Sequence, residues 1–392
     1  IKLKLNKNME KNILVLNSGS TSIKYSLFNE KLEKIDNGEE AGIGTKDGVK
    51  NHHEALERIF KNISGSGKIE NLSDIKAVGH RVVHGGEDLR KPVLINKNVL
   101  KKIKDYAKLA PLHNPPNIAG IEACQELLPW AKNVAVFDTG FYESLTPEGY
   151  LYAIPYELYQ KEKIRRYGFH GISHSYISQK AEKILGKKIK NLITCHLGGG
   201  SSITALKNGK PIDTSMGFTP LEGLIMTTRS GSIDPAIPLY LISNLGYTAN
   251  EVDNLLNKKS GFLGICDTNN FKEILERKDE KAKLAYQLFL RSVLKYIGGY
   301  VTLLGGLDVL VFTAGIGENA VRFRKDVVTH LKYLGAEIDE KRNKKNEVII
   351  SKKASKVEIL VIPTNEELMI AKETLKLIKK IYEKNNFPRR RR

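Results

Sequence analysis

The chain has 392 residues, of which 63 are Lys or Arg and 44 are Asp or Glu, so its formal net charge is +19. A hydrophobic fraction of 41% is ordinary for a globular protein and argues against disorder. No uncharged apolar run approaches the ~18 residues that a membrane-spanning helix needs, so we expect no membrane partner. Three cysteines far apart in the sequence, Cys124, Cys195 and Cys266, exclude a disulfide framework and favour a reducing compartment.

The positive excess raises the question of a nucleic-acid partner. The lysines are scattered through helical stretches and are not interleaved with aromatic residues, so we expect a solvated surface and no nucleic acid. Residues 1–12 lack the apolar segment of a secretory signal, and Met9 is a candidate native start. The sequence therefore predicts a cytoplasmic protein.

Short apolar strands alternate with helical stretches, which is the pattern of an α/β protein. The first strands, 13–17 and 23–28, are joined by a Ser/Gly turn and predict a hairpin. The elements expected after it are a helix over 52–63, a strand over 76–83, helices over 98–109 and 117–127, and a buried strand over 134–137.

A second hairpin, 192–196 with 201–206, repeats the plan of the first and suggests an internal duplication. The elements expected after it are a helix over 281–304, a strand over 309–313, a helix over 319–334, a strand over 359–362 and a final helix from about residue 365. We therefore expect two domains, 1–150 with the returning segment 366–392, and 151–365, the second binding a nucleotide.

Three small-residue segments have the character of phosphate-binding loops. The first hairpin turn is rich in hydroxyl groups and is followed by Lys24, whereas the second contains Gly198, Gly199 and Gly200 in succession. Three glycines between two strands are rarely tolerated unless a ligand must approach the backbone closely. The third segment, 315–320, follows a strand and opens a helix, so its N-terminus is suited to an anion.

The third segment also reads as the dinucleotide fingerprint GxGxxA, with Asp339 about two dozen residues on. This observation supplies the alternative hypothesis, an NAD-dependent dehydrogenase. Only about 75 residues follow the segment, which is too few for a complete dinucleotide-binding fold. The two glycine hairpins would also have no role in such an enzyme.

Two arginines in glycine-rich surroundings, Arg81 and Arg229, are candidate anion clamps, because a guanidinium is costly to bury without an anion. A structural ion pair is the alternative for each. Asp138 follows a buried strand, at the place where open α/β sheets carry catalytic groups.

Two histidine pairs have spacings that could chelate zinc, His80 with His84 and His170 with His174. Neither segment reads as a regular helix, and neither has an evident third ligand. We therefore expect no metal bound by histidines.

Taken in order, the following strings resemble the acetate kinase family (acetokinases) of the sugar kinase, Hsp70 and actin superfamily: NILVLNSGSTSIKYSLF, GHRVVHGGE, APLHNPPN, VFDTGF, RRYGFHGISH, MGFTPLEGLIMTTRSGSIDP, FTAGIGENA and VIPTNEELMIA. The resemblance implies two ribonuclease H-like (actin-like ATPase) domains related by duplication, with an interdomain active-site cleft, and a homodimer. It implies reversible Mg²⁺-dependent transfer of the γ-phosphoryl group of ATP to acetate, giving acetyl phosphate and ADP. Mn²⁺ is an alternative metal, and propionate or butyrate an alternative acceptor.

The resemblance also implies roles for individual residues around the reacting groups. By position, the metal residues are Asn17 and Glu366, and the phosphate contacts are Ser20, Ser22 and Lys24. The catalytic residues are the anion-stabilising arginines Arg81 and Arg229, the aspartate Asp138, the transition-state histidine His170 and a further active-site histidine, His113. The acyl pocket is formed by Val83, Leu112, Phe169 and Pro220, and Arg81 also contacts the substrate there. A carboxylate acceptor is already deprotonated, so we expect Asp138 to orient reacting groups rather than to abstract a proton. Val83 leaves a small pocket, which favours acetate.

The implied nucleotide loops include two departures from the family pattern. By position the loops comprise His196, Leu197, Gly198, Gly199 and Gly200, then Asp267, Thr268 and Asn269, and finally Gly315, Ile316, Gly317, Glu318 and Asn319. Gly199 stands where the family usually carries Asn, and Asp267–Asn269 stands in place of an Asp-x-Arg contact. These departures leave the nucleotide preference open.

Overall fold

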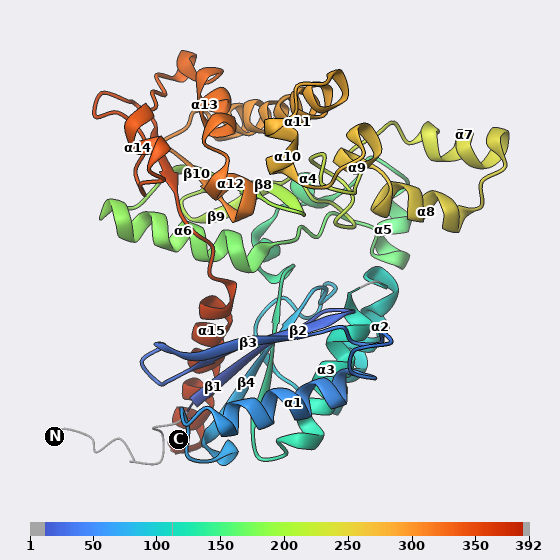
Figure 1. Ribbon diagram of the computed structural model, residues 1–392, viewed down its shortest axis with the longest axis vertical. Helices are drawn as coiled ribbons and strands as arrows, with labels where there is room; N and C mark the ends of the chain where they lie inside the picture. The colour runs from blue at the N-terminus through green and yellow to red at the C-terminus, as the bar shows by residue number, and fades with distance from the viewer. Residues whose placement is uncertain (1–11, 112, 387–392) are drawn as a thin grey trace, which may run out of the picture. The chain divides into compact units, whose positions relative to one another are not determined.

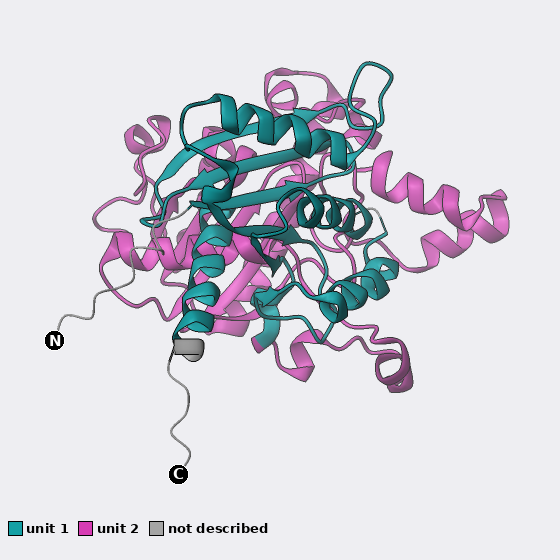
Figure 2. Cartoon of the chain, turned by 90° about the horizontal axis from the view of Figure 1, so that it is seen from below, with its two compact units in different colours: residues 1–143, 365–392 teal, residues 144–364 magenta. Residues whose placement is uncertain are grey.

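The computed structural model describes residues 12–111 and 113–386, and by compactness the chain forms two units. Unit 1 comprises residues 1–143 and 365–392, and unit 2 comprises residues 144–364; Figure 2 colours them teal and magenta. The predicted division of the chain into two domains, with boundaries at residues 150 and 365, stays a prediction. The candidate start at Met9 and the acyl-pocket residue Leu112 lie outside the described residues.

Unit 1 is built on a six-stranded sheet with the order β3-β2-β1-β4-β6-β5 (Figure 1). Its strands are β1 (Asn12–Ser18), β2 (Ser22–Phe28), β3 (Lys34–Ala41), β4 (Ile75–Val82), β5 (Val93–Leu94) and β6 (Lys132–Phe137). The first three strands form an antiparallel meander, and β4 and β6 then run parallel to β1. The carboxyl ends of β1, β4 and β6 therefore lie at one edge of the sheet.

Helices cover the sheet of unit 1 because their apolar stripes must be buried. Helix α1 (His52–Gly65) packs against α3 (Asn114–Leu127), and both contact the sheet. Helix α15 (Glu366–Asn386) returns from the end of the chain to pack on β1, β4 and β6. Two further helical segments, α2 (Lys97–Asp105) and η3 (Tyr106–Leu109), divide the single helix predicted over 98–109.

Unit 2 repeats this plan in a five-stranded sheet with the order β11-β10-β7-β8-β9. Its strands are β7 (Asn191–Leu197), β8 (Ser201–Lys207), β9 (Lys210–Thr214), β10 (Val309–Thr313) and β11 (Glu358–Val361). Here too an antiparallel meander comes first and two parallel strands follow beside its first strand. The predicted α/β fold with an internal duplication is thus confirmed.

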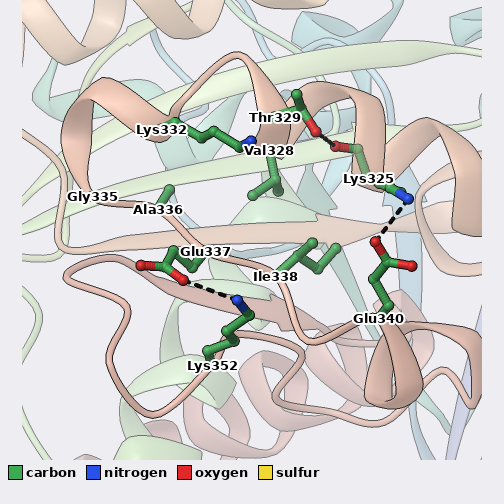
Figure 3. Close-up of a pocket in the computed structure, with 10 residues that line it drawn as sticks. All are labelled: Lys325, Val328, Thr329, Lys332, Gly335, Ala336, Glu337, Ile338, Glu340 and Lys352. Carbon is green, nitrogen blue, oxygen red and sulfur yellow. Dashed lines mark hydrogen bonds and ion pairs between the residues drawn. The ribbon is translucent and has the colours of Figure 1, made fainter.

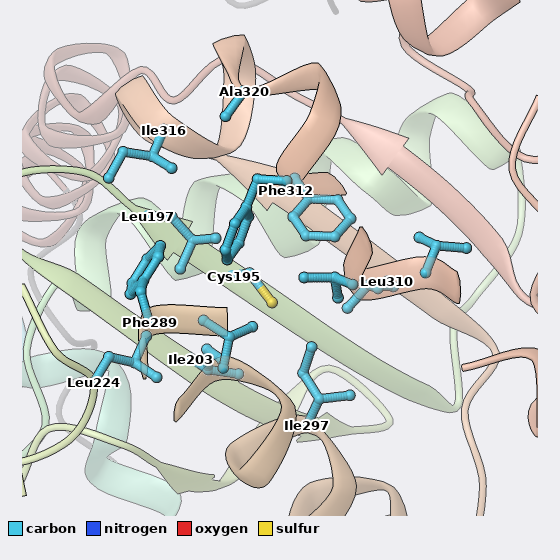
Figure 4. Packing of buried hydrophobic residues seen from close by; sticks show 14 of the residues in the cluster. Cys195, Leu197, Ile203, Leu224, Phe289, Ile297, Leu310, Phe312, Ile316 and Ala320 are labelled. Carbon is cyan, nitrogen blue, oxygen red and sulfur yellow. The ribbon is translucent and has the colours of Figure 1, made fainter. Parts of the chain in front are cut away.

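The core of unit 2 lies between its sheet and the long helix α11 (Glu280–Leu304). Figure 4 shows Cys195 and Ile203 from the sheet facing Phe289 and Ile297 from α11. Helix α6 (Gly171–Leu185) contacts β7 and β10. The other helices of unit 2 are α4 (Pro147–Tyr150), α5 (Tyr156–Glu162), α7 (Ala236–Leu245), α8 (Ala249–Lys258), α9 (Gly261–Cys266), α10 (Phe271–Glu276), α12 (Ala314–Asn319), α13 (Val321–Thr329) and α14 (Glu340–Lys344).

The helix predicted over 319–334 is wrong as a single element. Helix α12 ends at Asn319, α13 begins at Val321, and Ala320 between them has a non-helical backbone. The carbonyl oxygens of Gly317 and Glu318 accept hydrogen bonds from the buried guanidinium of Arg324, at 2.9 and 2.7 Å. A side chain thus satisfies carbonyls that a continuous helix would bond to its own backbone.

The described residues include no helix that is both long and apolar enough to span a membrane.

Candidate active site

Four predicted residues of unit 1 meet at the carboxyl edge of its sheet. Asn17 lies at the end of β1, Arg81 on β4, Asp138 directly after β6 and Glu366 at the start of α15. Nη2 of Arg81 donates to Oδ2 of Asp138 at 2.6 Å, Nη1 of Arg81 to Oδ1 of Asn17 at 3.4 Å, and Nε of Arg81 lies 3.8 Å from Oε2 of Glu366. Arg81 therefore lies within the strand that the sequence predicted over 76–83.

The charges of this group depend on one another. Burial works against the charge of Arg81, but Asp138 and Glu366 outweigh it and raise the pKa of the guanidinium. Burial raises the pKa of Glu366 to about 7, although Arg81 opposes the shift. Arg81 therefore remains positively charged. A further cation bound near Glu366 would lower the pKa of that carboxyl group and favour its charged form.

The residues beside Arg81 are suited to a magnesium ion. Oδ1 of Asp138 is buried and, within the described part of the chain, has no hydrogen-bond partner. Oxygen atoms of Asn17 and Glu366 lie around the same guanidinium. Carboxylate and amide oxygens are ligands that Mg²⁺ prefers, so this donor set fits the ion.

The first hairpin turn is open to solvent and held by its backbone. The N–H of Gly19 donates to the carbonyl of Ser22 at 2.8 Å, and Nε2 of His52 lies 2.8 Å from the carbonyl of Gly19. Ser20 is exposed and Ser22 partly buried. Lys24 is exposed, and its Nζ lies 3.9 Å from Oε2 of Glu39 on β3, which is too long for a hydrogen bond that would orient the ammonium group.

The predicted acyl-pocket residue Val83 and the predicted active-site histidine His113 both adjoin α3. Val83 is buried just after β4, and its N–H donates to Oδ1 of Asn117 at 3.1 Å. Nδ2 of Asn117 in turn donates to the carbonyl of Ser18 at 2.6 Å, which ties the end of β1 to the segment after β4. His113 is partly buried and directly precedes α3.

In unit 2, His170 and Arg229 lie beside the second glycine turn. A Cβ atom added to Gly200 would lie 3.2 Å from the His170 ring and 3.5 Å from Nη1 of Arg229, so both side chains border this glycine. The His170 ring stacks on the His196 ring with their centroids 4.2 Å apart. His170 has φ 56°, a left-handed backbone that directs its side chain at the start of α6.

Hydroxyl groups hold these rings in place. Oγ of Ser202 lies 2.9 Å from Nδ1 of His170 and 2.8 Å from Nε2 of His174. His196 has a similar contact of 2.8 Å to the hydroxyl of Ser173. Burial, with His196 nearby, lowers the pKa of His174 well below its ordinary value, so His174 is neutral. His174 lies within α6, which corrects the expectation of an irregular segment.

The remaining acyl-pocket residues also belong to unit 2. Phe169 is buried directly before His170. Pro220 lies in a long segment without helix or strand, and its carbonyl oxygen accepts from Nη1 of Arg229 at 3.4 Å. Pro220 and Arg229 are thus in contact.

The glycine loops of unit 2 border a pocket of about 790 Å³. Its lining includes six predicted nucleotide residues, Gly198, Gly199, Asn269, Gly315, Ile316 and Asn319. A Cβ atom at Gly315 would meet nothing within 4 Å, and one at Gly199 only the Thr227 hydroxyl, at 3.9 Å. Space for a ligand therefore adjoins both loops.

Other predicted nucleotide residues do not line this pocket. Leu197 belongs to the buried core (Figure 4). Asp267 is exposed and pairs with Lys281 at 3.1 Å, whereas the Thr268 hydroxyl donates to Glu273 at 2.6 Å. The Glu318 carboxylate accepts from the N–H of Ala314 at the start of α12, at 2.8 Å, and from the N–H of Thr364, at 3.2 Å. His196, Gly200 and Gly317 also lie outside the lining.

Sequence reasoning missed half of the lining: Thr227, Asn270, Phe271, Lys272, Leu275 and Ala320. Thr227 could have been found from its place two residues before Arg229 in a glycine-rich segment. Lys272 and Leu275 carry no local signal, because α10 reads as an ordinary amphipathic helix.

The model of the Acetokinase family matches residues 12–372. The acetate kinase of Carboxydothermus hydrogenoformans is 50% identical, over 93% of this chain and 99% of that protein. The chain belongs to the acetokinase family. Among solved structures, a propionate kinase from Francisella tularensis is 45% identical with a TM-score of 0.88, covering 93% of this chain and 99% of its own. The acetate kinase of Porphyromonas gingivalis is 39% identical with a TM-score of 0.88, covering 94% and 100%.

Membership of the acetokinase family removes the dehydrogenase alternative. The segment 315–320 does not form a tight turn before a long helix, because α12 already includes residues 315–319 and ends at Asn319. The sheet that precedes it also contains antiparallel strands. In this acetokinase Gly315 thus borders the pocket from a short helix.

The zinc-like histidine spacings lie in hydrogen-bonded surroundings. Nε2 of His80 lies 2.7 Å from Oδ1 of Asn133, and Nδ1 of His174 lies 2.7 Å from the hydroxyl of Thr194. Among the residues that the structure describes, no three His, Cys, Asp or Glu side chains are grouped around a possible metal position.

A second, smaller pocket of about 450 Å³ lies beside α13 (Figure 3). Its edge carries two exposed ion pairs, Lys325 with Glu340 at 2.7 Å and Lys352 with Glu337 at 3.1 Å. It shares no residue with the glycine-lined pocket. Exposed pairs of this kind contribute little to binding, so no role in the acetokinase reaction is assigned to it.

Proposed function

We propose that the chain transfers the γ-phosphoryl group of ATP to acetate, giving acetyl phosphate and ADP in a reversible, Mg²⁺-dependent reaction. Its membership of the acetokinase family and its 50% identity to a protein named acetate kinase support this function. In the reaction a bond forms between a carboxylate oxygen of acetate and the γ-phosphorus, and the bond from that phosphorus to the ADP oxygen breaks. Two anions must approach each other, so their repulsion has to be offset.

The observation that carries the proposal is the guanidinium of Arg229. Among residues 12–111 and 113–386 no acidic side chain pairs with it, and its contacts are the Pro220 carbonyl and Sδ of Met226, 3.6 Å away. Burial lowers its pKa. A partly buried cation of this kind, next to a glycine turn and an imidazole, is suited to bind an anion. The phosphoryl group in transfer supplies that anion.

We assign each remaining residue by its contacts. His170 and Arg229 stabilise the charge on the equatorial phosphoryl oxygens, and Arg81 binds the acceptor carboxylate. Asp138 keeps Arg81 oriented through the 2.6 Å bond and abstracts no proton. Within unit 1, Asn17, Asp138 and Glu366 would hold Mg²⁺, with Mn²⁺ as an alternative. The bound metal would neutralise phosphate charge.

The pocket of about 790 Å³ is the proposed site of the ATP nucleoside, since its size suits a molecule of that kind. Gly198 and Gly315 allow the phosphates to approach the backbone. Ser20, Ser22 and Lys24 are proposed as further phosphate contacts.

We propose acetate as the preferred acceptor. Val83, Phe169, Pro220 and Leu112 are the proposed acyl pocket, with His113 as a further active-site residue. One structural neighbour is named a propionate kinase, so propionate is the second candidate. One methylene group in an apolar pocket changes discrimination by about 1–3 kcal/mol. Rates with acetate, propionate and butyrate distinguish the candidates, and a preference for butyrate would contradict the assignment.

We also propose a cytoplasmic homodimer. Helix α7 supports the dimer, because none of its residues is buried, and Figure 1 shows α7 and α8 extending from the rest of unit 2. The large apolar side chains exposed on α7 are Ile237, Leu239, Tyr240, Ile242 and Leu245. A patch of this kind is typical of an interaction surface. Cys124, Cys195 and Cys266 are free and buried, which suits a reducing compartment.

A hydroxamate assay for acyl phosphate tests the function directly. We expect product only when ATP, Mg²⁺ and acetate are all present. Hydrolysis of ATP without hydroxamate formation would contradict the proposal, because it would leave the acceptor unused.

A further inference from the structure

The connection from β9 to α7, residues 215–235, is an unusually long segment without helix or strand. Segments of this length inside a compact unit are usually functional and need their own supports. This one contains both Pro220 and Arg229, the two residues assigned above to the acceptor and the phosphoryl group. What holds its first part in place therefore matters for the reaction.

Three side chains outside the proposed site brace the start of this segment. Nη1 of Arg166 donates to the carbonyl oxygens of Thr214 at 2.9 Å and Met216 at 3.3 Å, and its Nη2 donates to Oε1 of Glu222 at 2.8 Å. The hydroxyl of Tyr152 donates to Oε2 of Glu222. Both oxygens of one carboxylate are thus engaged, one by each partner.

Tyr152 closes the brace around the turn. Its hydroxyl oxygen accepts from the N–H of Phe218 at 2.8 Å, so the Glu222 carboxylate is linked through Tyr152 to a residue four positions earlier. A Cβ atom at Gly217 would lie 1.6 Å from Oε2 of Glu222 and 2.2 Å from the Tyr152 hydroxyl. Only glycine leaves room for the carboxylate here. Residues 218–221 are therefore fixed at both ends.

The turn is also connected to the histidine segment. The carbonyl oxygen of Gly217 accepts from the N–H of Tyr167 at 3.0 Å, two residues before Phe169 and three before His170. On the other side, Pro220 contacts Arg229. The same small turn thus determines the positions of the acyl-pocket proline and, through it, of the Arg229 guanidinium.

The charges support a positioning role. Burial, with Glu222 beside it, raises the pKa of Tyr152, so the phenol stays protonated and keeps donating. Glu222 opposes the burial cost of Arg166 and raises the pKa of that guanidinium, which therefore stays charged. The two hydrogen-bond donors of the brace, the Tyr152 phenol and the Arg166 guanidinium, therefore keep the protons with which they bond Glu222.

We propose that Tyr152, Glu222 and Arg166 are positioning residues for the acceptor half of the reaction, and that they set its selectivity for the acyl chain. This inference rests on the proposed acetate kinase function. Loss of the brace lets residues 218–221 move, so the acyl pocket widens and Arg229 is held less well. Contacts around the nucleotide pocket do not include the brace.

The test uses Tyr152→Phe, which keeps the ring and removes both hydrogen bonds of the hydroxyl. Tyr286→Phe is the matched control, because its hydroxyl donates to Asp326 at 2.5 Å in the same unit and this bond involves no residue of 215–235. For each full-length enzyme we measure KM for acetate and for ATP, kcat, the ratio of kcat/KM for acetate to that for propionate, and the urea unfolding midpoint.

We expect Tyr152→Phe to raise KM for acetate about tenfold and to lower the acetate-to-propionate ratio, with KM for ATP little changed. Tyr286→Phe should leave KM for acetate and the ratio unaltered. Glu222→Gln gives a second variant, which should change the same two quantities in the same direction. An unchanged acetate KM and ratio in Tyr152→Phe would overturn the inference, whether or not the unfolding midpoint falls. Wild-type protein without acyl phosphate production would instead overturn the proposed function.

Discussion

The two candidate anion-binding arginines differ in their surroundings, and this difference predicts opposite effects of substitution on stability. Arg81 is paired with Asp138 at 2.6 Å and lies 3.8 Å from Glu366, whereas Arg229 has no acidic partner in the described ranges. Methionine has a similar length and no charge. We therefore compare Arg81→Met with Arg229→Met.

The expected magnitudes follow from what each substitution leaves behind. In Arg81→Met the carboxylate of Asp138, which is 1% exposed, loses its partner, and breaking such a buried pair costs about 3–5 kcal/mol of unfolding free energy. In Arg229→Met no carboxylate is left unpaired, and a partly buried charge disappears, so stability should be unchanged or higher. Both variants should lose activity about 10²–10³-fold, equivalent to about 3–4 kcal/mol of transition-state stabilisation.

Urea unfolding and the hydroxamate assay measure the two quantities on the same preparations. Arg322→Met is the control, because its side chain is 68% exposed and its contact to Asp326 is 3.8 Å long. It should alter neither quantity. If Arg229→Met were as destabilised as Arg81→Met, Arg229 would be a structural residue and the reasoning would be refuted; full activity of Arg229→Met would refute the anion site itself.

Three further predictions concern single residues. Burial lowers the pKa of His80 to about 4, so the stability that the neutral ring contributes is present above pH 6.5 and is lost as the pH falls towards 4, by about 3 kcal/mol. The urea midpoint should therefore fall less steeply with decreasing pH in His80→Gln than in the wild type, and an equal pH dependence in both proteins would contradict this assignment. Lys272 lines the nucleotide pocket, so Lys272→Ala should raise KM for ATP several-fold and leave KM for acetate unchanged, whereas the reverse pattern in steady-state rates would exclude a nucleotide contact. Asp138→Asn keeps the size of the side chain but weakens the hold on Arg81, so turnover should fall at least ~100-fold, and near-normal turnover would contradict its role.

Local patterns were sufficient to predict most of the strands. The apolar runs at 13–17 and 134–137 identify β1 and β6, because a strand that is buried on both faces consists of consecutive apolar residues. Strand β3 was missed, since Lys34–Ala41 is charged and lies at the edge of the sheet, where pairing with β2 rather than composition makes it a strand. The break between α12 and α13 was missed because Arg324 acts on carbonyls six and seven residues before it.

For the site, sequence alone determined which residue types are available: the glycine turns, the two arginines, the aspartate after a buried strand and the family they resemble together. Tertiary structure decided what each of them touches. It pairs Arg81 with Asp138, leaves Arg229 without a carboxylate in the described ranges, and directs Leu197 into the core. The physical reason is that charge pairing and pocket lining depend on strand order and on contacts between distant segments, which no local pattern encodes.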